Sequence, residues 1–201
     1  MNFSRTNLEI ETLQEDLSQL QSLLTPLISQ NLLNRENEHI RILNLACGRA
    51  DESGILKKIL QPYTQHLHIT GVDIRDRELD TARSIWRSDD STQFDFLHQD
   101  ATKLDEIAQL SPPFDIAFMR HQNYWNGDLT WKRIYDSALH RLKSQGLLII
   151  TSYFDREHIL ALTAIQQLGA TLVTTIRNPS SRTINDAPNK SVDRHIAVFK
   201  I

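Results

Sequence analysis

Apolar and polar residues follow two alternating patterns along most of this chain. From residue 41 onward, short apolar runs alternate with stretches in which apolar residues recur every three or four positions. The runs are typical of buried strands, and the spaced pattern is typical of amphipathic helices. We expect strands at 41–46, 67–73, 94–100, 115–120 and 147–154, with helices at 51–63, 75–88, 129–143 and 156–169. This order predicts a parallel sheet covered by helices on both faces.

The C-terminal part of the chain breaks this alternation. Segments 170–178 and 193–201 both have strand patterns, but the stretch between them has no helical pattern. A parallel return needs a crossover, usually a helix, so the last strand should run antiparallel. The predicted fold is therefore an α/β three-layer sandwich, with a mostly parallel seven-stranded sheet and an antiparallel last strand.

The N-terminal residues carry an apolar stripe of their own. Leucine and isoleucine fall three and four positions apart between residues 10 and 27, which predicts a helix over 8–33 with one apolar face. Thr6 and Glu9 fit a capping box at its start. Thr25-Pro26 predicts a break into two helices, because proline disrupts a helix interior. We expect a helical extension over 1–35 that packs on a domain over 36–201, with a lid and a homodimer contact as alternatives.

Composition narrows the class of protein. The chain has 201 residues, a formal charge of −3 and a pI of about 6.2. This balance gives no broad positive field, so we expect no nucleic-acid partner. Cys47 is the only cysteine, which excludes an internal disulfide, and the histidines show no metal-ligand spacing. No apolar run is long enough for a membrane span and the start is not a signal peptide, so a cytoplasmic protein is expected.

Candidate ligand-binding residues follow the predicted strands. In open α/β sheets, ligands bind beyond the carboxyl ends of the strands. The first strand ends at Ala46-Cys47-Gly48, the second at Asp73, the third at Asp100 and the fourth at Arg120-His121. A carboxylate after the second strand commonly accepts hydrogen bonds from ribose hydroxyls, and a glycine lets a ligand approach the backbone closely.

Five segments carry a resemblance to a known family. "ILNLACGRAD" (42–51) resembles a strand that closes on a glycine turn, and "GVDI" (71–74) an acidic ribose-binding segment. "FLHQDATKL" (96–104), "PFDIAFMRHQN" (113–123) and "LKSQGLLIITSYF" (142–154) follow in the same order. In order and spacing these segments resemble the class I S-adenosylmethionine-dependent methyltransferases, which implies a Rossmann-like fold over about 36–201.

The resemblance also implies a cofactor and residues that hold it. S-adenosyl-L-methionine would be the cofactor, with Asp73 at the ribose and Asp100 and Ala101 beside the adenine. Ala46, Cys47 and Gly48 would lie at the methionine end, and Ile74 and Arg120 complete the expected cofactor-binding set. The chain departs from the family pattern where Ala46 replaces the first glycine of the turn, and where Ser144 and Gln145 replace Pro-Gly before the fifth strand.

The sequence predicts less about the residues that would contact the methyl acceptor. The segment 120–128 follows the fourth strand and points toward the expected methyl group. His121 is the candidate base, since an ordinary histidine titrates near pH ~6.5. Tyr124 is the second candidate catalytic residue, with packing against the N-terminal helix as its alternative. Residues 177–200 carry five basic and two acidic side chains, which would suit an anionic small molecule, although a solvated basic loop is the favoured explanation.

Two other functions compete with methyl transfer. A methyltransferase-like scaffold without turnover would explain the altered turn at Ala46, with the N-terminal stripe recruiting a partner. A nicotinamide-dependent oxidoreductase is disfavoured because the turn reads A-C-G-R-A-D, whereas a dinucleotide loop needs G-x-G-x-x-G. Asp51 and Glu52 at the following helix start would also repel a phosphate.

Overall fold

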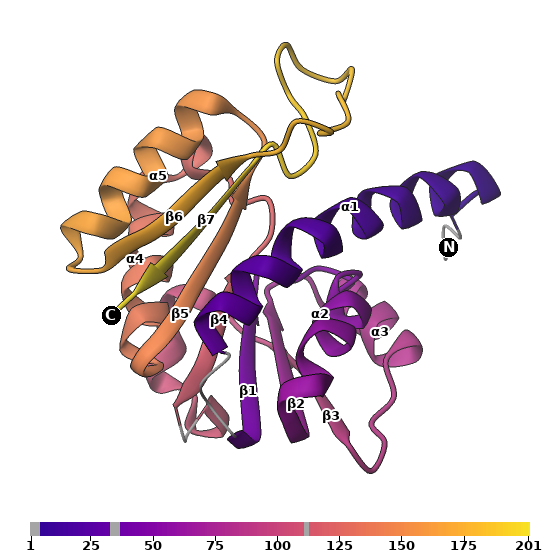
Figure 1. The fold of residues 1–201 in the computed structure, drawn as a ribbon, viewed down its shortest axis with the longest axis vertical. Coiled ribbons are helices and arrows are strands. Elements are labelled where there is room, and N and C mark those ends of the chain that lie inside the picture. Colours follow the sequence, from indigo (N-terminus) through magenta and orange to yellow (C-terminus); the bar gives the residue numbers. More distant parts are fainter. Residues whose placement is uncertain (1–4, 33–36, 111–112) are drawn as a thin grey trace.

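The computed structural model describes residues 5–32, 37–110 and 113–201, and its central feature is a seven-stranded sheet with helices on both faces (Figure 1). The strand order is β3-β2-β1-β4-β5-β7-β6. Neighbouring strands from β3 through β5 pair in parallel, and β7 pairs antiparallel with both β5 and β6. The predicted α/β sandwich with an antiparallel last strand is confirmed.

The strands match the expected segments closely. They are β1 (Asn37–Leu45), β2 (Thr64–Asp73), β3 (Thr92–His98), β4 (Phe114–Met119), β5 (Leu142–Ser152), β6 (Thr171–Arg177) and β7 (His195–Lys200). The amino ends of β1 and β5 lie several residues earlier than the apolar runs predict. Residues 37–39 of β1 and 143–145 of β5 are polar, and only the ladders with β2 and β4 reveal that these strands begin so early.

In the part of the chain that the structure describes, five α-helices connect or cover these strands. They are α1 (Asn7–Leu32), α2 (Ser53–Leu60), α3 (Asp76–Ile85), α4 (Asp128–His140) and α5 (Asp155–Gln167), and short 3₁₀ turns lie at 61–63, 101–106, 108–110 and 124–126. None of the helices in the described part of the chain is long and apolar enough to cross a membrane.

Two large apolar clusters lie on opposite faces of the sheet, because successive residues of a strand point to opposite sides. Ile40 and Ile42 of β1 face α1 and α2, whereas Leu43 and Leu45 face α4 and α5. A third, smaller cluster lies under α3, where Phe96 of β3 packs with residues of that helix. The doubly buried central strands explain the nearly unbroken apolar runs in the sequence.

Helix α1 is continuous, so the predicted break at Thr25-Pro26 is wrong. Pro26 lies inside the helix, where it removes one backbone hydrogen bond at a cost of about 3 kcal/mol. Leu24 and Ile28, on either side of it, are fully buried against the sheet. Since burial of each such side chain stabilises the fold by about 1.5–3 kcal/mol, packing outweighs the local cost of the proline.

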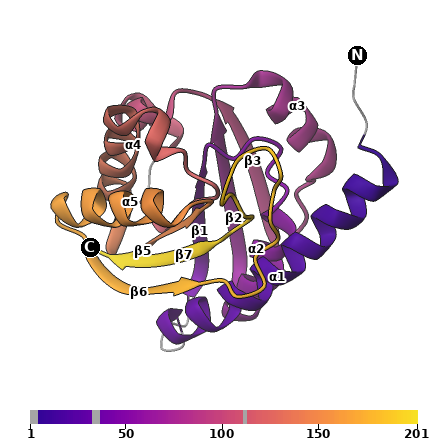
Figure 2. The same cartoon turned by 90° about the horizontal axis from the view of Figure 1, so that it is seen from above.

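The last two strands form the predicted hairpin, and the segment between them has no helix. Loop 178–192 leaves β6 at the carboxyl edge of the sheet and returns into β7 (Figure 1). Seen from above, the loop lies over the ends of the central strands and reaches toward α1 (Figure 2). Arg182 of the loop donates to Asp16 of α1, at 2.9 and 2.6 Å. The loop and the first half of α1 therefore meet above the edge where ligands are expected.

Candidate functional site

The turn between β1 and α2 forms the floor of the candidate site. Ala46, Gly48 and Ala50 all have positive φ, between 51° and 53°, a region that glycine enters freely and other residues at a cost. The N–H of Cys47 donates to the carbonyl of Val72 at 3.2 Å, which ties the turn to β2. Two alanines of this turn, Ala46 and Ala50, thus adopt a backbone conformation that glycine would enter without strain.

Asp73, the last residue of β2, lies directly against that turn. Its side chain is only 3% exposed, and its Oδ2 accepts a hydrogen bond from the N–H of Gly48 at 2.7 Å. Arg75 donates to the same carboxylate from its N–H, Nε and Nη2, at 2.8, 3.0 and 3.1 Å. Burial acts to raise the pKa of Asp73, but the hydrogen bonds from Arg75 and Gly48 outweigh it and lower the pKa. Asp73 is therefore a carboxylate at neutral pH.

A cavity of about 350 Å³ opens above the turn. Its walls come from the N-terminal segment, the β1–α2 turn, the start of α3 and the ends of β4 and β5. The lining residues are Arg5, Ala46, Cys47, Gly48, Arg49, Asp51, Glu52, Arg75, Glu78, Arg120, His121 and Tyr153. Of the residues singled out in the sequence, five line it together: Ala46, Cys47, Gly48, Arg120 and His121.

Beneath the cavity, two polar side chains are buried together. Asn44 of β1 donates through Nδ2 to Oε1 of Glu52 at 2.5 Å, and both residues are at most 4% exposed. Burial raises the pKa of Glu52, and Arg120 acts against that rise. Oδ1 of Asn44 is buried without a hydrogen-bond partner in the described structure. An unpaired acceptor beside a carboxylate suits a ligand with an ammonium group.

On the opposite wall, Arg120 and His121 share one carboxylate. Asp193, 2% exposed, accepts from Nη2 of Arg120 at 2.7 Å and lies 2.9 Å from Nε2 of His121. Burial lowers the pKa of His121, and the attraction of Asp193 only partly offsets this. The histidine is therefore neutral at pH 7. The Tyr153 ring stacks on the imidazole, with 4.1 Å between the ring centroids.

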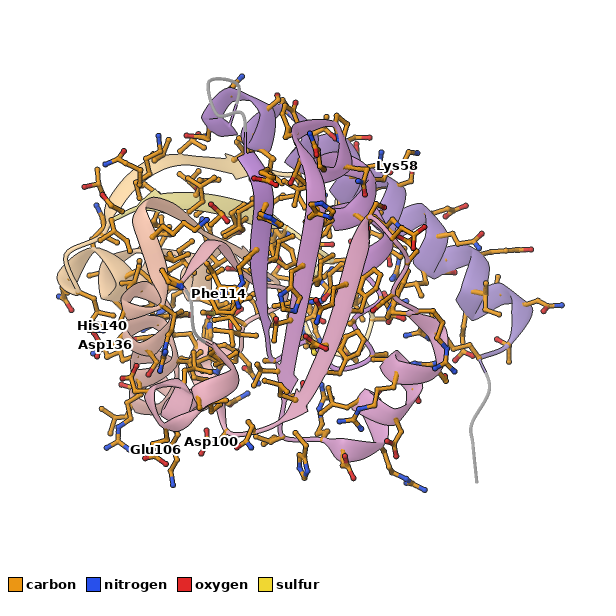
Figure 3. The ribbon with its side chains drawn as sticks, turned by 90° about the horizontal axis from the view of Figure 1, so that it is seen from below. Lys58, Asp100, Glu106, Phe114, Asp136 and His140 are labelled. Carbon is orange, nitrogen blue, oxygen red and sulfur yellow. The ribbon has the colours of Figure 1, made fainter. Side chains whose placement is uncertain are left out.

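Four of the expected cofactor residues lie outside the cavity lining: Asp73, whose carboxylate is held by Arg75, and Ile74, Asp100 and Ala101. Ile74 follows Asp73 and exposes 67% of its surface, which leaves an apolar side chain free at the edge of the site. Asp100 lies at the rim of the molecule beyond β3 (Figure 3), and its carboxylate caps the next turn by accepting from the N–H of Thr102 at 2.9 Å. Ala101 is buried beneath it.

Tyr124 does not line the cavity either. It is 6% exposed, and its ring stacks on that of Tyr135 at 6.1 Å in the cluster beneath α4. The packing alternative describes its surroundings, with one difference: the partner is α4 and not the N-terminal helix. Its neighbour Trp125 is half exposed and lies near Phe154 and Arg156.

Sequence reasoning missed several residues of the site. Asp193 and Tyr153 lie 72 and 32 positions beyond His121 in the chain, and no local pattern marks either of them. Arg5 reaches the site because it forms an ion pair with Asp51, at 2.9 and 2.6 Å. Asp51 and Glu52 did carry a signal, as acidic residues in the turn before α2.

Comparisons with known proteins agree with this geometry. The model of a methyltransferase domain family matches residues 36–186, most of the chain. No curated protein matches the sequence. Among solved structures, an S-adenosylmethionine-dependent methyltransferase from Clostridium acetobutylicum superposes with a TM-score of 0.64 at 12% identity, covering 92% of both chains.

Two further structures share the fold at similar distance. The N-methyltransferase NodS from Bradyrhizobium japonicum, crystallised with S-adenosyl-L-homocysteine, has a TM-score of 0.59 at 15% identity, covering 94% of this chain and 96% of its own. An rRNA methylase from Streptococcus thermophilus has a TM-score of 0.58 at 13% identity, covering 87% and 93%. Because the family model spans most of the chain and these solved structures share the fold, the chain belongs to the class I S-adenosylmethionine-dependent methyltransferase family.

Proposed function

We propose that this protein transfers the methyl group of S-adenosylmethionine to a small-molecule acceptor in the cavity above Gly48. The observation that carries the proposal is the buried Asp73 carboxylate, bonded to the Gly48 N–H at the carboxyl edge of the sheet. Asp73 is suited to accept hydrogen bonds from the ribose. A nucleoside without a pyrophosphate also fits a turn followed by Asp51 and Glu52, whose charges disfavour phosphate.

The remaining cofactor contacts follow from the surroundings of Asp73. Ile74 offers an exposed apolar surface for one face of the adenine, and Asp100 and Ala101 lie at the adenine end. The methionine end belongs at Ala46, Cys47 and Gly48. There, Glu52 can accept from an ammonium group, and Arg120 supplies a positive charge.

Bound S-adenosylmethionine supplies an electrophilic methyl group on its sulfonium. The task of the chain is then to position an acceptor in line and to keep water away. His121 is neutral and lies on the cavity wall. Its Nε2 accepts from the N–H of Asp193 at 3.2 Å and lies 2.9 Å from the carboxylate of the same residue, so Nδ1 is the ring nitrogen left to contact the acceptor. The stacked Tyr153 ring covers one face of this imidazole.

Charge distribution supports a small acceptor over a nucleic acid. Three basic side chains of the C-terminal hairpin already have acidic partners in the chain: Arg182 pairs with Asp16, Lys190 with Asp186 and Arg194 with Asp155. A surface built to bind phosphates would leave such side chains free. The overlying segments, joined by the Arg5–Asp51 and Arg182–Asp16 pairs, also narrow the approach to the cavity.

One observation favours a second function, a scaffold that keeps the fold without turnover. Ala46, Ala50 and Gln145 all adopt positive φ, and the family pattern has glycine at the first and last of these positions. A binding site under relaxed selection would tolerate such strain. A calorimetric titration with S-adenosylmethionine separates this alternative from the proposed enzyme.

The test is calorimetric titration of the purified protein with S-adenosylmethionine, S-adenosylhomocysteine and NAD. We expect micromolar binding of the first two and none of NAD. Asp73→Ala should abolish binding, and Asp73→Asn should weaken it at least about tenfold, because a buried charge-assisted hydrogen bond contributes about 1.5–3 kcal/mol. Asp76→Asn, an exposed acid three residues on, is the control. Unchanged affinity in both Asp73 variants would contradict the proposal, and no binding by the wild type would favour the scaffold.

A further inference from the structure

Arg75 is hydrogen-bonded to the Asp73 carboxylate, the group that a cofactor ribose would need. We propose that its guanidinium takes the place of the ribose hydroxyls on Asp73 when the site is empty, and that it must leave before the cofactor can bind. Arg75 then determines how tightly the cofactor is held. The inference rests on the proposed function and concerns a residue that the family resemblance does not mark.

The hydrogen bonds to Asp73 show the competition directly. A carboxylate accepts about four hydrogen bonds, two on each oxygen. In this structure all four positions are filled: Oδ2 accepts from Gly48 N and Arg75 Nη2, and Oδ1 accepts from Arg75 N and Arg75 Nε. The two backbone donors belong to the fold and stay. Only the two guanidinium bonds can be released, and a ribose brings two hydroxyl donors to replace them.

The same guanidinium also covers the glycine that a ligand would approach. Nη2 of Arg75 lies 2.9 Å from the point where a Cβ on Gly48 would stand. The space left free by the missing side chain is thus filled by Arg75 and not by the backbone of another element. A ligand that uses both Asp73 and the bare face of Gly48 meets Arg75 at each contact.

Arg75 is able to move, because it lies at the surface. Its side chain is 59% exposed, whereas that of Asp73 is 3% exposed. Glu78, one turn into α3, lines the same cavity, and its charge contributes to the raised pKa of Arg75. When the guanidinium releases Asp73, it can therefore contact water and the nearby Glu78 carboxylate. Exchange of the guanidinium for a ribose thus needs no change in the backbone.

Competition of this kind lowers apparent affinity by the fraction of protein in which the site is open. Replacement of Arg75 by methionine keeps the apolar stem and removes the competitor. S-adenosylhomocysteine is a suitable probe, since its ammonium and carboxylate charges cancel and loss of one positive charge has little long-range effect on it. Arg77→Met is the matched control, because Arg77 is an exposed arginine two residues on and its loss changes the net charge equally.

We expect Arg75→Met to bind S-adenosylhomocysteine about five- to tenfold more tightly than the wild type, and Arg77→Met to bind it equally. The empty Arg75→Met protein should melt at a lower temperature than the empty wild type, because Asp73 loses two charge-assisted hydrogen bonds. Equal or weaker binding by Arg75→Met, with measurable binding by the wild type, would overturn the inference and leave the proposed function standing. Absence of binding in both proteins, each of them folded, would overturn the two together.

Discussion

Ala46 illustrates how single residues of the site accept strain. Its φ of 51° lies in a region where a side chain costs an L-residue about 1 kcal/mol or more. The turn keeps this conformation because Cys47 is tied to Val72 and Gly48 to Asp73. His121 and Asp193 also have positive φ, at 57° and 45°, so both partners of the buried pair are held in uncommon conformations. Such clustering of strain at one edge is typical of a functional site.

We therefore expect Ala46→Gly to raise the free energy of unfolding by up to about 1 kcal/mol, since relief of strain exceeds the added flexibility of the unfolded chain. Ala82→Gly is the control with the opposite sign. Ala82 lies inside α3 and is fully buried, so glycine there should destabilise the protein by about 1 kcal/mol. Urea unfolding of the three proteins measures both changes. A destabilised Ala46→Gly would show that the methyl group contributes more by packing than it costs in strain.

At the scale of elements, α5 is fastened to the sheet by a buried histidine. His158 lies 3.0 Å through Nδ1 from Ser152 Oγ of β5, and 2.7 Å through Nε2 from Thr175 Oγ1 of β6. Burial lowers the pKa of His158 to about 4, and the neighbouring His195 ring, 4.5 Å away, adds to the shift. The folded protein therefore holds this histidine neutral under conditions in which the unfolded chain protonates it.

This shift predicts a loss of stability in acid. Between pH 6.5 and pH 4 the unfolded chain binds a proton that folded His158 does not, so His158 lowers the free energy of unfolding by up to about 3 kcal/mol. His158→Gln should remove this part of the pH dependence. Burial raises the pKa of the adjacent Glu157 to about 7, which makes stability depend on pH in the opposite direction. Because wild type and His158→Gln both contain Glu157, its contribution cancels when their pH profiles are subtracted. Unfolding curves from pH 4 to pH 8, with the exposed His140→Gln as control, provide the measurement. Parallel pH profiles of wild type and His158→Gln would contradict the assignment.

At the scale of the whole molecule, α1 has two halves in different surroundings. Its second half packs on the sheet, where Leu20, Leu24 and Ile28 are fully buried with β1, β2 and β4. Its first half extends past the sheet edge (Figure 1), and Leu8 there is 72% exposed. One helix thus completes the core and also reaches the candidate site. The predicted boundary at residue 35 separates segments of the chain that share one apolar cluster.

The shared cluster leads us to expect that α1 unfolds together with the domain. Leu24→Ala should lower the free energy of unfolding by about 2–5 kcal/mol, because it leaves a cavity against the sheet. Leu8→Ala on the same helix should change it by less than about 0.5 kcal/mol. Both values follow from denaturant unfolding monitored by circular dichroism and by tryptophan fluorescence. Non-coincident transitions in the wild type would show instead that α1 is an independent unit.

The order of elements was available from the sequence, because apolar periodicity reports burial locally. Continuous runs such as Leu147–Ile150 identify strands buried on both faces, and the missing helix between 178 and 192 required the antiparallel hairpin. The candidate cofactor residues were predicted from the same pattern, because they directly follow the predicted strands in the chain, and their contacts with a cofactor stay a prediction. Pro26 led to the wrong prediction of a helix break, because the burial that keeps α1 continuous involves residues distant in sequence.

Tertiary structure alone decided the partners of the predicted site residues. The sequence predicts Asp73 and His121 as site residues. It does not show that Arg75 binds the Asp73 carboxylate, or that Asp193 holds the His121 ring. These pairings depend on side-chain direction and on chain segments that meet only after β7 inserts between β5 and β6. Local pattern determines which segments become strands and helices, whereas electrostatic pairing across the sheet edge is a property of the assembled fold.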